Sequence, residues 1–549
     1  MQPIYSRCIQ GSGQVVAVAV ADDLNLVGRP SAVFKAFDCF EKELGAGTGL
    51  SIRKEKCAVL WPRRDLPDQV RDEAKKRGLQ CRIDTMETLG GLVGSGDADF
   101  HKWLTDYVEG IQPYFDSLLH PELPTQIAFQ LLRLSAVPKI GFLTRIVPPR
   151  LLQPHAVRFD ELVVRTFTQK CGLSNHLSDA AKFTISLPIR LGGLGLRSAV
   201  ASSVAAYFCS VSAAAPHIID DIIPLSRHEQ FIGPGVSQSP LITELNRCWQ
   251  ILSDQRVTKG PNGLIPEQPV DLWKGGGGRS RQRAINAFLT DTSARDFLRA
   301  TPLRDQQRLV SASAKRASAW LTSIPSSPEL AINDADFIFA VRHRLGLPCA
   351  EGLPQVCTCE EPLDDDSAHF QSCIDQRRTS VTARHDFVVR ALAALFRHVE
   401  AWVHIEPRIY RVERLRPDLE VTFPDQTLLI DVAIAHPAAP SRTSVLPLAA
   451  TAGPEREKIK KYKALAHSQG STFLPFVLES YGAYGVQAEK VLKILFSAAR
   501  NSARPLPSGV GTFADYAVKT VSLALQKGNA LVARKGATEV RAAAVGRRK

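Results

Sequence analysis

The stretch RPDLEVTFPDQTLLIDVAI, residues 416–434, decides the fold of the carboxy-terminal part of the chain. We expect an apolar strand, a hairpin and a second apolar strand, with Asp418 on the first and Asp431, thirteen residues later, on the second. A metal-dependent phosphodiesterase needs this arrangement, because the two acids bind Mg²⁺ or Mn²⁺, which polarises the phosphate and supplies hydroxide. Asp418 and Asp431 are therefore candidate catalytic metal ligands. The alternative is that Arg-Pro-Asp forms an ordinary turn.

A basic helix is expected downstream, where residues 455–465 read EREKIKKYKAL. Lys458, Lys461 and Tyr462 stand at i, i+3 and i+4, so they share one face of this helix. A lysine beside the acids can stabilise the charge that builds on the phosphate. The familiar place for that lysine, two residues after the second acid, is held by Ala433. The helix therefore offers the candidate replacements, and the alternative is a solvated basic face.

A cluster of cysteine and histidine lies upstream of these strands. Cys357, Cys359, His369 and Cys373 form a C-x-C-x9-H-x3-C array. Tetrahedral zinc takes four such ligands on two short supports, and four protein ligands leave no open position for water, so we predict a structural Zn²⁺. Cys349, eight residues before the first ligand, could substitute for one of them. The alternative is a set of unrelated reduced cysteines near a surface histidine.

Two adjacent acids mark the amino-terminal part of the chain. Apolar, β-rich runs flank Asp22-Asp23, which predicts a buried hairpin with the acids at its tip. Nucleotidyl transfer needs carboxylates that hold two divalent metals, and such a tip can supply part of that cluster. An Asp-Asp pair is a weak signal by itself, since Asp220-Asp221 reads as a solvated loop. The alternative is an unrelated α/β unit with a surface Asp-Asp.

Four segments in order resemble reverse transcriptases of non-LTR retrotransposons. AVADDLNLVG (19–28) resembles the Asp-Asp box, and GLSIRKEKC (49–57) the strand after it. TLGGLVG (88–94) resembles the hairpin at the thumb base, and LPIRLGGLGLRSA (187–199) a segment beyond the polymerase. The resemblance covers roughly residues 15–215. It implies a palm and a helical thumb, with Asp22 and Asp23 as polymerase-like metal ligands.

One departure from the family weakens the polymerase reading. The family needs a third aspartate on a strand well upstream, but the 21 residues before Asp22 include no acid. A two-metal site that lacks one carboxylate should lose most of its activity. We therefore expect a palm remnant that is inactive as a polymerase, in a truncated or rearranged copy.

The carboxy-terminal motifs resemble the restriction-like endonuclease domain of site-specific non-LTR retrotransposon proteins. The resemblance spans about 345–497 and follows the family's order: the Cys/His knuckle, Arg384-His385-Asp386, Arg416-Pro417-Asp418, Asp431-Val432 and Lys458-x-x-Lys461-Tyr462. It implies that Lys458 is the displaced catalytic lysine, with Lys461 and Tyr462 as supporting groups. It also implies that Arg384 and His385 face the DNA or the active site, and that Arg416 contacts DNA. His385 could instead cap or pack.

The composition limits the classes of protein to which the chain can belong. A chain of 549 residues and 60.1 kDa suggests two to four domains. With 44% hydrophobic and 22% charged residues it is not a disordered or fibrous protein. The 68 basic and 55 acidic residues leave a net charge of +13, which fits a polyanionic partner.

Cysteine usage and hydropathy bear on the compartment. Eleven scattered cysteines, without a secretory leader, indicate a reducing compartment. Ser198–Ile219 carries no Lys, Arg, Asp or Glu, but it is mostly Ala and Ser and is interrupted by Pro216. We expect a buried helix there and no membrane partner.

Together these observations predict an α+β multidomain protein. The predicted parts are a partial palm (1–100), a helical thumb-like region (101–252), a linker (253–283), a helical connector (284–345), a zinc knuckle (346–375), a PD-(D/E)XK-like α/β endonuclease core (376–500) and a basic tail (501–549). We expect this tail to be a solvated or nucleic-acid-contacting arm. The resemblance implies a nuclear protein that nicks target DNA with Mg²⁺ or Mn²⁺ and, in the family, primes RNA-directed DNA synthesis on element RNA. The alternative is a non-catalytic, zinc-stabilised nucleic-acid-binding remnant.

Overall fold

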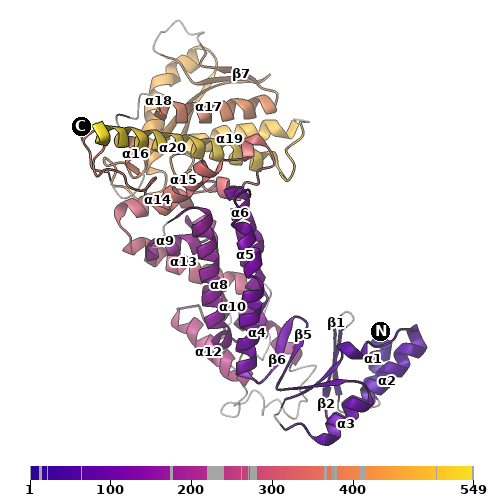
Figure 1. Cartoon of the computed structure of the whole chain (residues 1–549). Coiled ribbons are helices and arrows are strands. Elements are labelled where there is room, and N and C mark those ends of the chain that lie inside the picture. The colour runs from indigo at the N-terminus through magenta and orange to yellow at the C-terminus, as the bar shows by residue number, and fades with distance from the viewer. Residues whose placement is uncertain are drawn as a thin grey trace. The chain divides into compact units, whose positions relative to one another are not determined.

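The computed structural model describes residues 2–10, 15–20, 23–62, 65–173, 177–218, 240–260, 262–269, 271, 281–363, 368–373, 375, 380–407, 415–501 and 504–546. Helices dominate these residues, and their strands form one four-stranded and three two-stranded sheets (Figure 1). The expected α+β class is confirmed.

The chain forms two compact units, each built from three stretches of sequence. Unit 1 comprises Met1–Ile111, Ile140–Phe159 and Ala199–Asn286, and unit 2 comprises Gln112–Lys139, Asp160–Ser198 and Ala287–Lys549. The predicted thumb-like region therefore contributes to both units. The identities of the seven predicted segments stay predictions.

Unit 1 contains the three two-stranded sheets. The strands are β1 (Val15–Val20) with β2 (Asp23–Gly28), β3 (Ala58–Trp61) with β4 (Gln80–Ile83), and β5 (Thr85–Thr88) with β6 (Gly91–Gly94). The first and third pairs are antiparallel and the second is parallel. The hairpin predicted around the adjacent aspartates is present, but its end is not buried, because Val18 and Val20 are 43% and 49% exposed.

The helices of unit 1 are α1 (Gln2–Gln10), α2 (Pro30–Thr48), α3 (Asp68–Lys76), α4 (Asp97–Gly110), α7 (Leu143–Ile146), α10 (Ala199–His217) and α12 (Pro240–Asp254), with the first parts of α8 (Pro149–Lys170) and α13 (Arg281–Ala300). Pro30 fits the first turn of α2, where its missing N–H costs nothing. Gly49, at a φ of 71°, ends that helix in the left-handed region that favours glycine.

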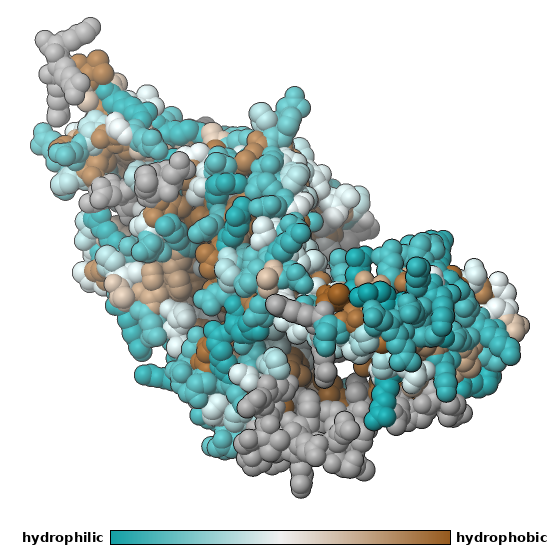
Figure 2. All heavy atoms as spheres, turned by 60° about the horizontal axis from the view of Figure 1, so that its bottom comes forward, coloured by the Kyte–Doolittle hydropathy of each residue, from teal (hydrophilic) through white to brown (hydrophobic). Residues whose placement is uncertain are grey.

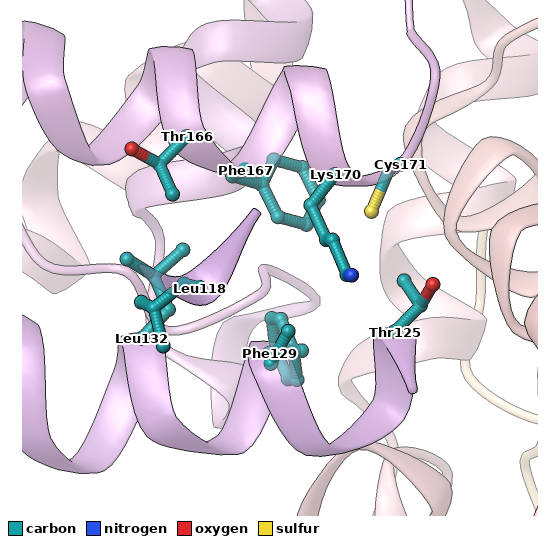
Figure 3. A pocket seen from close by; sticks show the side chains of 9 residues that line it. Leu118, Thr125, Phe129, Leu132, Thr166, Phe167, Lys170 and Cys171 are labelled. Carbon is teal, nitrogen blue, oxygen red and sulfur yellow. The ribbon is translucent and has the colours of Figure 1, made fainter. Parts of the chain in front are cut away.

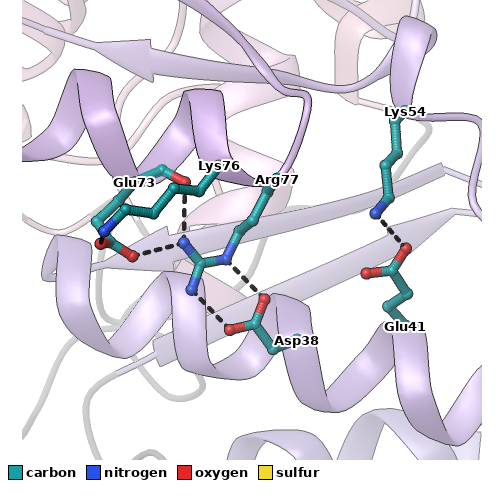
Figure 4. A network of polar contacts seen from close by, with 6 residues as sticks. All are labelled: Asp38, Glu41, Lys54, Glu73, Lys76 and Arg77. Atoms are coloured by element: carbon teal, nitrogen blue, oxygen red, sulfur yellow. Dashed lines mark hydrogen bonds and ion pairs between the residues drawn. The ribbon is translucent and has the colours of Figure 1, made fainter.

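A network of ion pairs fixes α3 against α2 (Figure 4). The guanidinium of Arg77 donates to both carboxylate oxygens of Asp38, at 2.6 and 2.7 Å, and to Oε2 of Glu73 at 2.7 Å. The same guanidinium lies over the ring of Phe34, 4.8 Å from its centroid. The bidentate geometry orients the arginine more strictly than a single contact would.

Unit 2 contains the four-stranded sheet. Its strands are β7 (Trp402–Ile405), β8 (Leu419–Thr422), β9 (Thr427–Ala435) and β10 (Thr472–Glu479), in the order β10-β9-β8-β7. β7, β8 and β9 are antiparallel neighbours, and β10 runs parallel to β9. A parallel pair needs a crossover, which α18 (Ala449–Ser468) supplies while packing on β9 and β10.

The other helices of unit 2 are α5 (Gln112–Leu118), α6 (Thr125–Leu131), α9 (Asp179–Ser186), α14 (Leu303–Ser313), α15 (Asp334–Leu345), α16 (Ala368–Ser372), α17 (Ser380–His398), α19 (Val486–Ala498) and α20 (Phe513–Gly546), with the later parts of α8 and α13. α17 packs on β7, β8 and β9, and α19 packs on β10.

The basic tail is a correction to the sequence analysis. Residues 513–546 form the 34-residue helix α20, which packs along α17 and contacts α15 and α16 (Figure 1). Val521, Leu525 and Val532 are at most 1% exposed. The tail is therefore a core helix of unit 2 rather than a solvated arm, because its apolar residues are buried where it packs against α15, α16 and α17.

Two helical segments of the described chain are long and apolar enough to cross a membrane by length and composition alone. They are Thr125–Ile146 and Ala199–His217, and 44% and 50% of their apolar windows are buried inside the protein. Such burial is typical of core helices. On the face seen in Figure 2, hydrophobic atoms occur in small groups among hydrophilic ones.

Two histidines are buried in the core of unit 2. His343 on α15 stacks on Tyr481, with ring centroids 4.3 Å apart, and Nδ1 of His436 lies 2.7 Å from Oγ of Ser480. Burial lowers the pKa of His343 to about 3, and burial also lowers the pKa of His436 well below its usual value. Both rings are therefore neutral in the folded protein near neutral pH.

This burial predicts a loss of stability in acid. Unfolding returns both pKa values to about 6.5, so below that pH the unfolded chain binds protons that the folded chain excludes. The free energy of unfolding should fall by up to about 1.4 kcal/mol per pH unit for each histidine, from pH 6.5 down to the folded pKa values. Urea titrations at pH 7 and pH 5 measure this, and His343→Phe should reduce the difference. An unchanged difference in His343→Phe, matching the exposed control His404→Phe, would contradict it.

Candidate active site and metal centre

The two candidate acids of unit 2 lie opposite each other at the end of paired strands. In the antiparallel pair β8–β9, Leu419 is the partner of Ile430. Asp418 precedes Leu419 and Asp431 follows Ile430, so the two acids occupy the next pair of positions. Directly opposed residues project from the same face of a sheet. Oδ2 of Asp418 also accepts a hydrogen bond from the N–H of Val432, at 2.6 Å. The sheet therefore brings the carboxylates together.

His385 on α17 contacts the carboxylate of Asp418. Its Nε2 lies 2.9 Å from Oδ2 of Asp418, and its Nδ1 lies 3.1 Å from Oδ1 of Asp386. Burial lowers the pKa of His385, but the hydrogen bonds and charges of Asp418 and Asp386 outweigh burial and raise the pKa above its usual value. A histidine held between two carboxylates fixes one oxygen of Asp418 and leaves the other for a ligand.

Lys458 lies against the second acid. Its ammonium forms an ion pair and a hydrogen bond with Oδ2 of Asp431, whose side chain is 8% exposed. Burial and the negative charge of Asp418 raise the pKa of Asp431, and the charges of Lys458 and Lys461 offset part of that rise. Two carboxylates this close repel each other in a buried site, which a bound cation would relieve. Helix α18 thus places a lysine beside the acids, although Ala433 occupies the familiar place for that lysine, two residues after the second acid.

Tyr462 and Arg416 hold the segment that carries Asp418. Tyr462 is 1% exposed, and its hydroxyl donates to the carbonyl oxygen of Arg416 at 2.9 Å. Its ring stacks on Phe473 (centroids 4.9 Å apart), and Nζ of Lys461 lies 4.7 Å from the centroid of the Tyr462 ring. The Arg416 guanidinium is exposed and pairs with Glu406. Tyr462 therefore holds the chain beside Asp418, whereas the guanidinium of Arg416 is engaged by Glu406.

Arg384 occupies a different place from the one expected. It is 2% exposed, and its guanidinium donates to Oε1 of Gln371 at 2.7 Å and to Oδ1 of Asn529 at 3.4 Å. A side chain enclosed in this way has no surface for a phosphate. The prediction that Arg384 faces DNA or the active site is thus corrected: it is a buried link between α16, α17 and α20.

The four predicted zinc ligands converge. Their ligand atoms all lie within 4.8 Å of one another, with Cys357 and Cys373 buried and Cys359 and His369 half-buried. The Sγ atoms of Cys357 and Cys373 are 3.8 Å apart, and Sγ of Cys359 is 3.4 Å from Nε2 of His369. A tetrahedron with Zn–S bonds of about 2.3 Å separates its sulfurs by about 3.8 Å. The residues therefore fit Zn²⁺ and could bind it.

Cys349 lies outside this group of four. It packs, half-buried, against the apolar cluster that includes Cys357, Phe370 and Val532. The structure thus favours the ligand set predicted from spacing and gives Cys349 a packing role.

The amino-terminal acids are only partly described. Asp22 lies outside the described residues. Asp23 opens β2, is exposed and pairs with Val20 in the register of the hairpin. The described residues do not test the polymerase-like metal site.

Two cavities in unit 2 lie away from the acids. One, of about 10 Å³, sits among helices between Phe129, Phe167 and Cys171 (Figure 3). It has room for about one water, so it is a packing gap rather than a ligand site. The other, of about 240 Å³, lies beside α14 and the segment after β9, with the buried Glu479 in its wall.

Sequence comparison gives a distant relationship. No family model matches the chain. It is 23% identical over 392 residues to the retrotransposable element SLACS 132 kDa protein of Trypanosoma brucei gambiense. The match covers 69% of this chain and 27% of that protein, so the chain corresponds to about a quarter of its length. The similarity supports a retrotransposon-related protein.

Proposed function

We propose that the chain is part of a retrotransposon protein and that unit 2 is a metal-dependent endonuclease that nicks DNA. The observation that carries this is the pair Asp418 and Asp431 on neighbouring strands, with the ammonium of Lys458 on Asp431. A divalent cation such as Mg²⁺ or Mn²⁺, held by these carboxylates, would supply Lewis acidity to the scissile phosphate. Target DNA and element RNA, met in the nucleus, are the partners that this proposal implies.

The protein's own groups position and stabilise the reacting phosphate. His385 and the N–H of Val432 both hold Oδ2 of Asp418, which fixes the orientation of this carboxylate. The ammonium of Lys458 lies on Asp431, and a phosphate at a cation held by the two acids would be close to it. Lys458 would therefore stabilise the negative charge that develops on that phosphate. Tyr462 keeps the Arg416 carbonyl, and hence the start of β8, in place.

A second function is a zinc-stabilised protein that binds nucleic acid without cutting it. The observation in its favour is that Asp431 is already neutralised by Lys458, so this carboxylate has a charged partner without any metal ion. The converging Cys/His group and the net charge of +13 fit both functions.

A plasmid assay separates the two. With supercoiled DNA and Mg²⁺, we expect nicking by the wild type and a decrease of about a hundredfold or more in Asp431→Ala, because the site loses a carboxylate that would bind the cation. Asp425→Ala, at an exposed acid in the turn between β8 and β9, is the matched control and should nick normally. Equal inertness of all three proteins would favour the binding function, and equal nicking would place the activity elsewhere.

A further inference from the structure

A buried polar network starts between two of the candidate zinc ligands. Gln371 lies on α16, two residues after His369 and two before Cys373. Its Oε1 accepts from Nη1 of Arg384 at 2.7 Å, and its Nε2 donates to the backbone oxygen of Asn529 at 3.2 Å. The short helix that carries a ligand is therefore bonded to both α17 and α20.

Arg384 depends on these neutral acceptors. Burial lowers the pKa of its guanidinium to about 10, and within the described chain it has no carboxylate partner within 4.0 Å. Its acceptors are amide oxygens: Oε1 and the backbone oxygen of Gln371, and Oδ1 of Asn529. A buried cation is costly without its hydrogen bonds. If α16 moved away, Arg384 would lose the Gln371 acceptors and could not stay where it is.

The next residue along α17 belongs to the acidic site. His385 holds Oδ2 of Asp418, whereas Arg384 points into the interior toward Gln371. Successive residues on one helix are rigidly linked, so a shift at Arg384 also shifts His385.

Two glycines of α20 set the spacing between these parts. A Cβ on Gly536 would lie 2.3 Å from Cδ1 of Phe370, next to the ligand His369, and a Cβ on Gly528 would lie 2.7 Å from Cγ of Arg384. Only glycine allows either approach. α20 thus holds the Cys/His segment and the start of α17 next to each other. Nδ2 of Asn529 also donates to the backbone oxygen of Ser480, the residue after β10, at 2.7 Å.

We propose that Gln371 and Arg384 couple metal binding at the Cys/His cluster to the geometry of the acidic site. Bound metal holds α16, α16 supplies the acceptors of Arg384, and Arg384 holds α17 so that His385 stays on Asp418. Both are positioning residues, since neither touches the acids. The catalytic part of this inference rests on the proposed endonuclease; the coupling of metal binding to the order of α17 does not.

Hydrogen exchange on the full chain tests the coupling without relying on cleavage. Removing zinc from the wild type with a chelator should speed exchange in residues 380–388 as well as in 357–373. Gln371→Met should show fast exchange in 380–388 even with one equivalent of zinc bound, whereas Gln371→Glu, which keeps an acceptor oxygen, should restore slow exchange. Gln355→Met, at an exposed glutamine of the same segment, is the control.

Nicking provides the second readout. Gln371→Met should nick about tenfold more slowly with little change in the KM for DNA, and Gln371→Glu should recover. Protection of 380–388 that survives both zinc removal and Gln371→Met would overturn the coupling. A wild type that never nicks would instead refute the endonuclease, and the exchange comparison would still decide the coupling.

Discussion

Replacing Lys458 with methionine is expected to reduce metal-dependent nicking by about a hundredfold or more while DNA affinity stays within about twofold. The ammonium is the cationic group on Asp431, and it is held there by the fold, so it needs no rearrangement to meet charge that develops on the phosphate. Methionine keeps most of the side-chain volume and removes only the charge. Single-turnover nicking and a DNA-binding titration on the same preparation measure the two quantities.

The control for Lys458 lies on the same helix. Lys460 and Lys463 are exposed on α18, and their methionine variants remove the same charge away from the acids. Both should nick at close to the wild-type rate and lose a little DNA affinity at low salt. If Lys458→Met behaved like these two variants, the lysine would have only a general electrostatic role and the proposed catalytic role would be lost.

Replacing Cys373 with alanine is expected to lower zinc affinity by at least about a hundredfold and to destabilise unit 2. Binding of a structural zinc contributes on the order of 10 kcal/mol to folding, and a site with three protein ligands keeps only part of that. Cys373 is also buried against α20, where Val532 and Val540 pack on the cluster, so loss of the metal should loosen that contact. Metal analysis after gel filtration, chelator competition and thermal unfolding report the effect.

Cys349→Ala is the matched control for the zinc site, because Cys349 packs on the same apolar cluster but lies outside the group of four. It should keep one equivalent of zinc. Zinc lost from Cys349→Ala but kept in Cys373→Ala would mean that the ligand set is a different one.

The sequence predicts local features of the site well. The spacing of Cys357, Cys359, His369 and Cys373 is enough to predict a cluster, because short chain separations force the ligands close together. The acids of 416–434 are also predictable, since two short strands joined by a tight turn must pair. The exact pairing of Asp418 with Asp431 depends on the register of β8 and β9, which the geometry of the turn and the buried face set together.

Long-range packing could not be predicted from the sequence. The basic charge of the tail (501–549) indicates a solvated or nucleic-acid-contacting arm, but the burial of Val521 and Leu525 depends on the presence of α17 opposite them. The family resemblance implies that Arg384 faces the DNA or the active site, and no local pattern pairs it with Gln371 or Asn529. Asp386, the second partner of His385, was visible as the third residue of Arg-His-Asp.

In unit 1, too, the sequence predicts some local features but not how they are buried or where they end. The resemblance places a strand at residues 49–57, but the strand forms at Ala58–Trp61, because the charged Lys54–Lys56 segment is a 3₁₀ turn. The hairpin of residues 15–28 was predictable from its apolar runs, but its exposed end was not, since burial there depends on what packs against it.

The most direct test of the account is diffraction from crystals grown with Mn²⁺, using the anomalous signal to locate the ion. We expect a peak within coordination distance of carboxylate oxygens from both Asp418 and Asp431, which disappears in Asp431→Asn and is displaced by excess Mg²⁺. An empty acidic site in well-ordered wild-type crystals, with the two carboxylates turned apart or Lys458 still closing over Asp431, would contradict it.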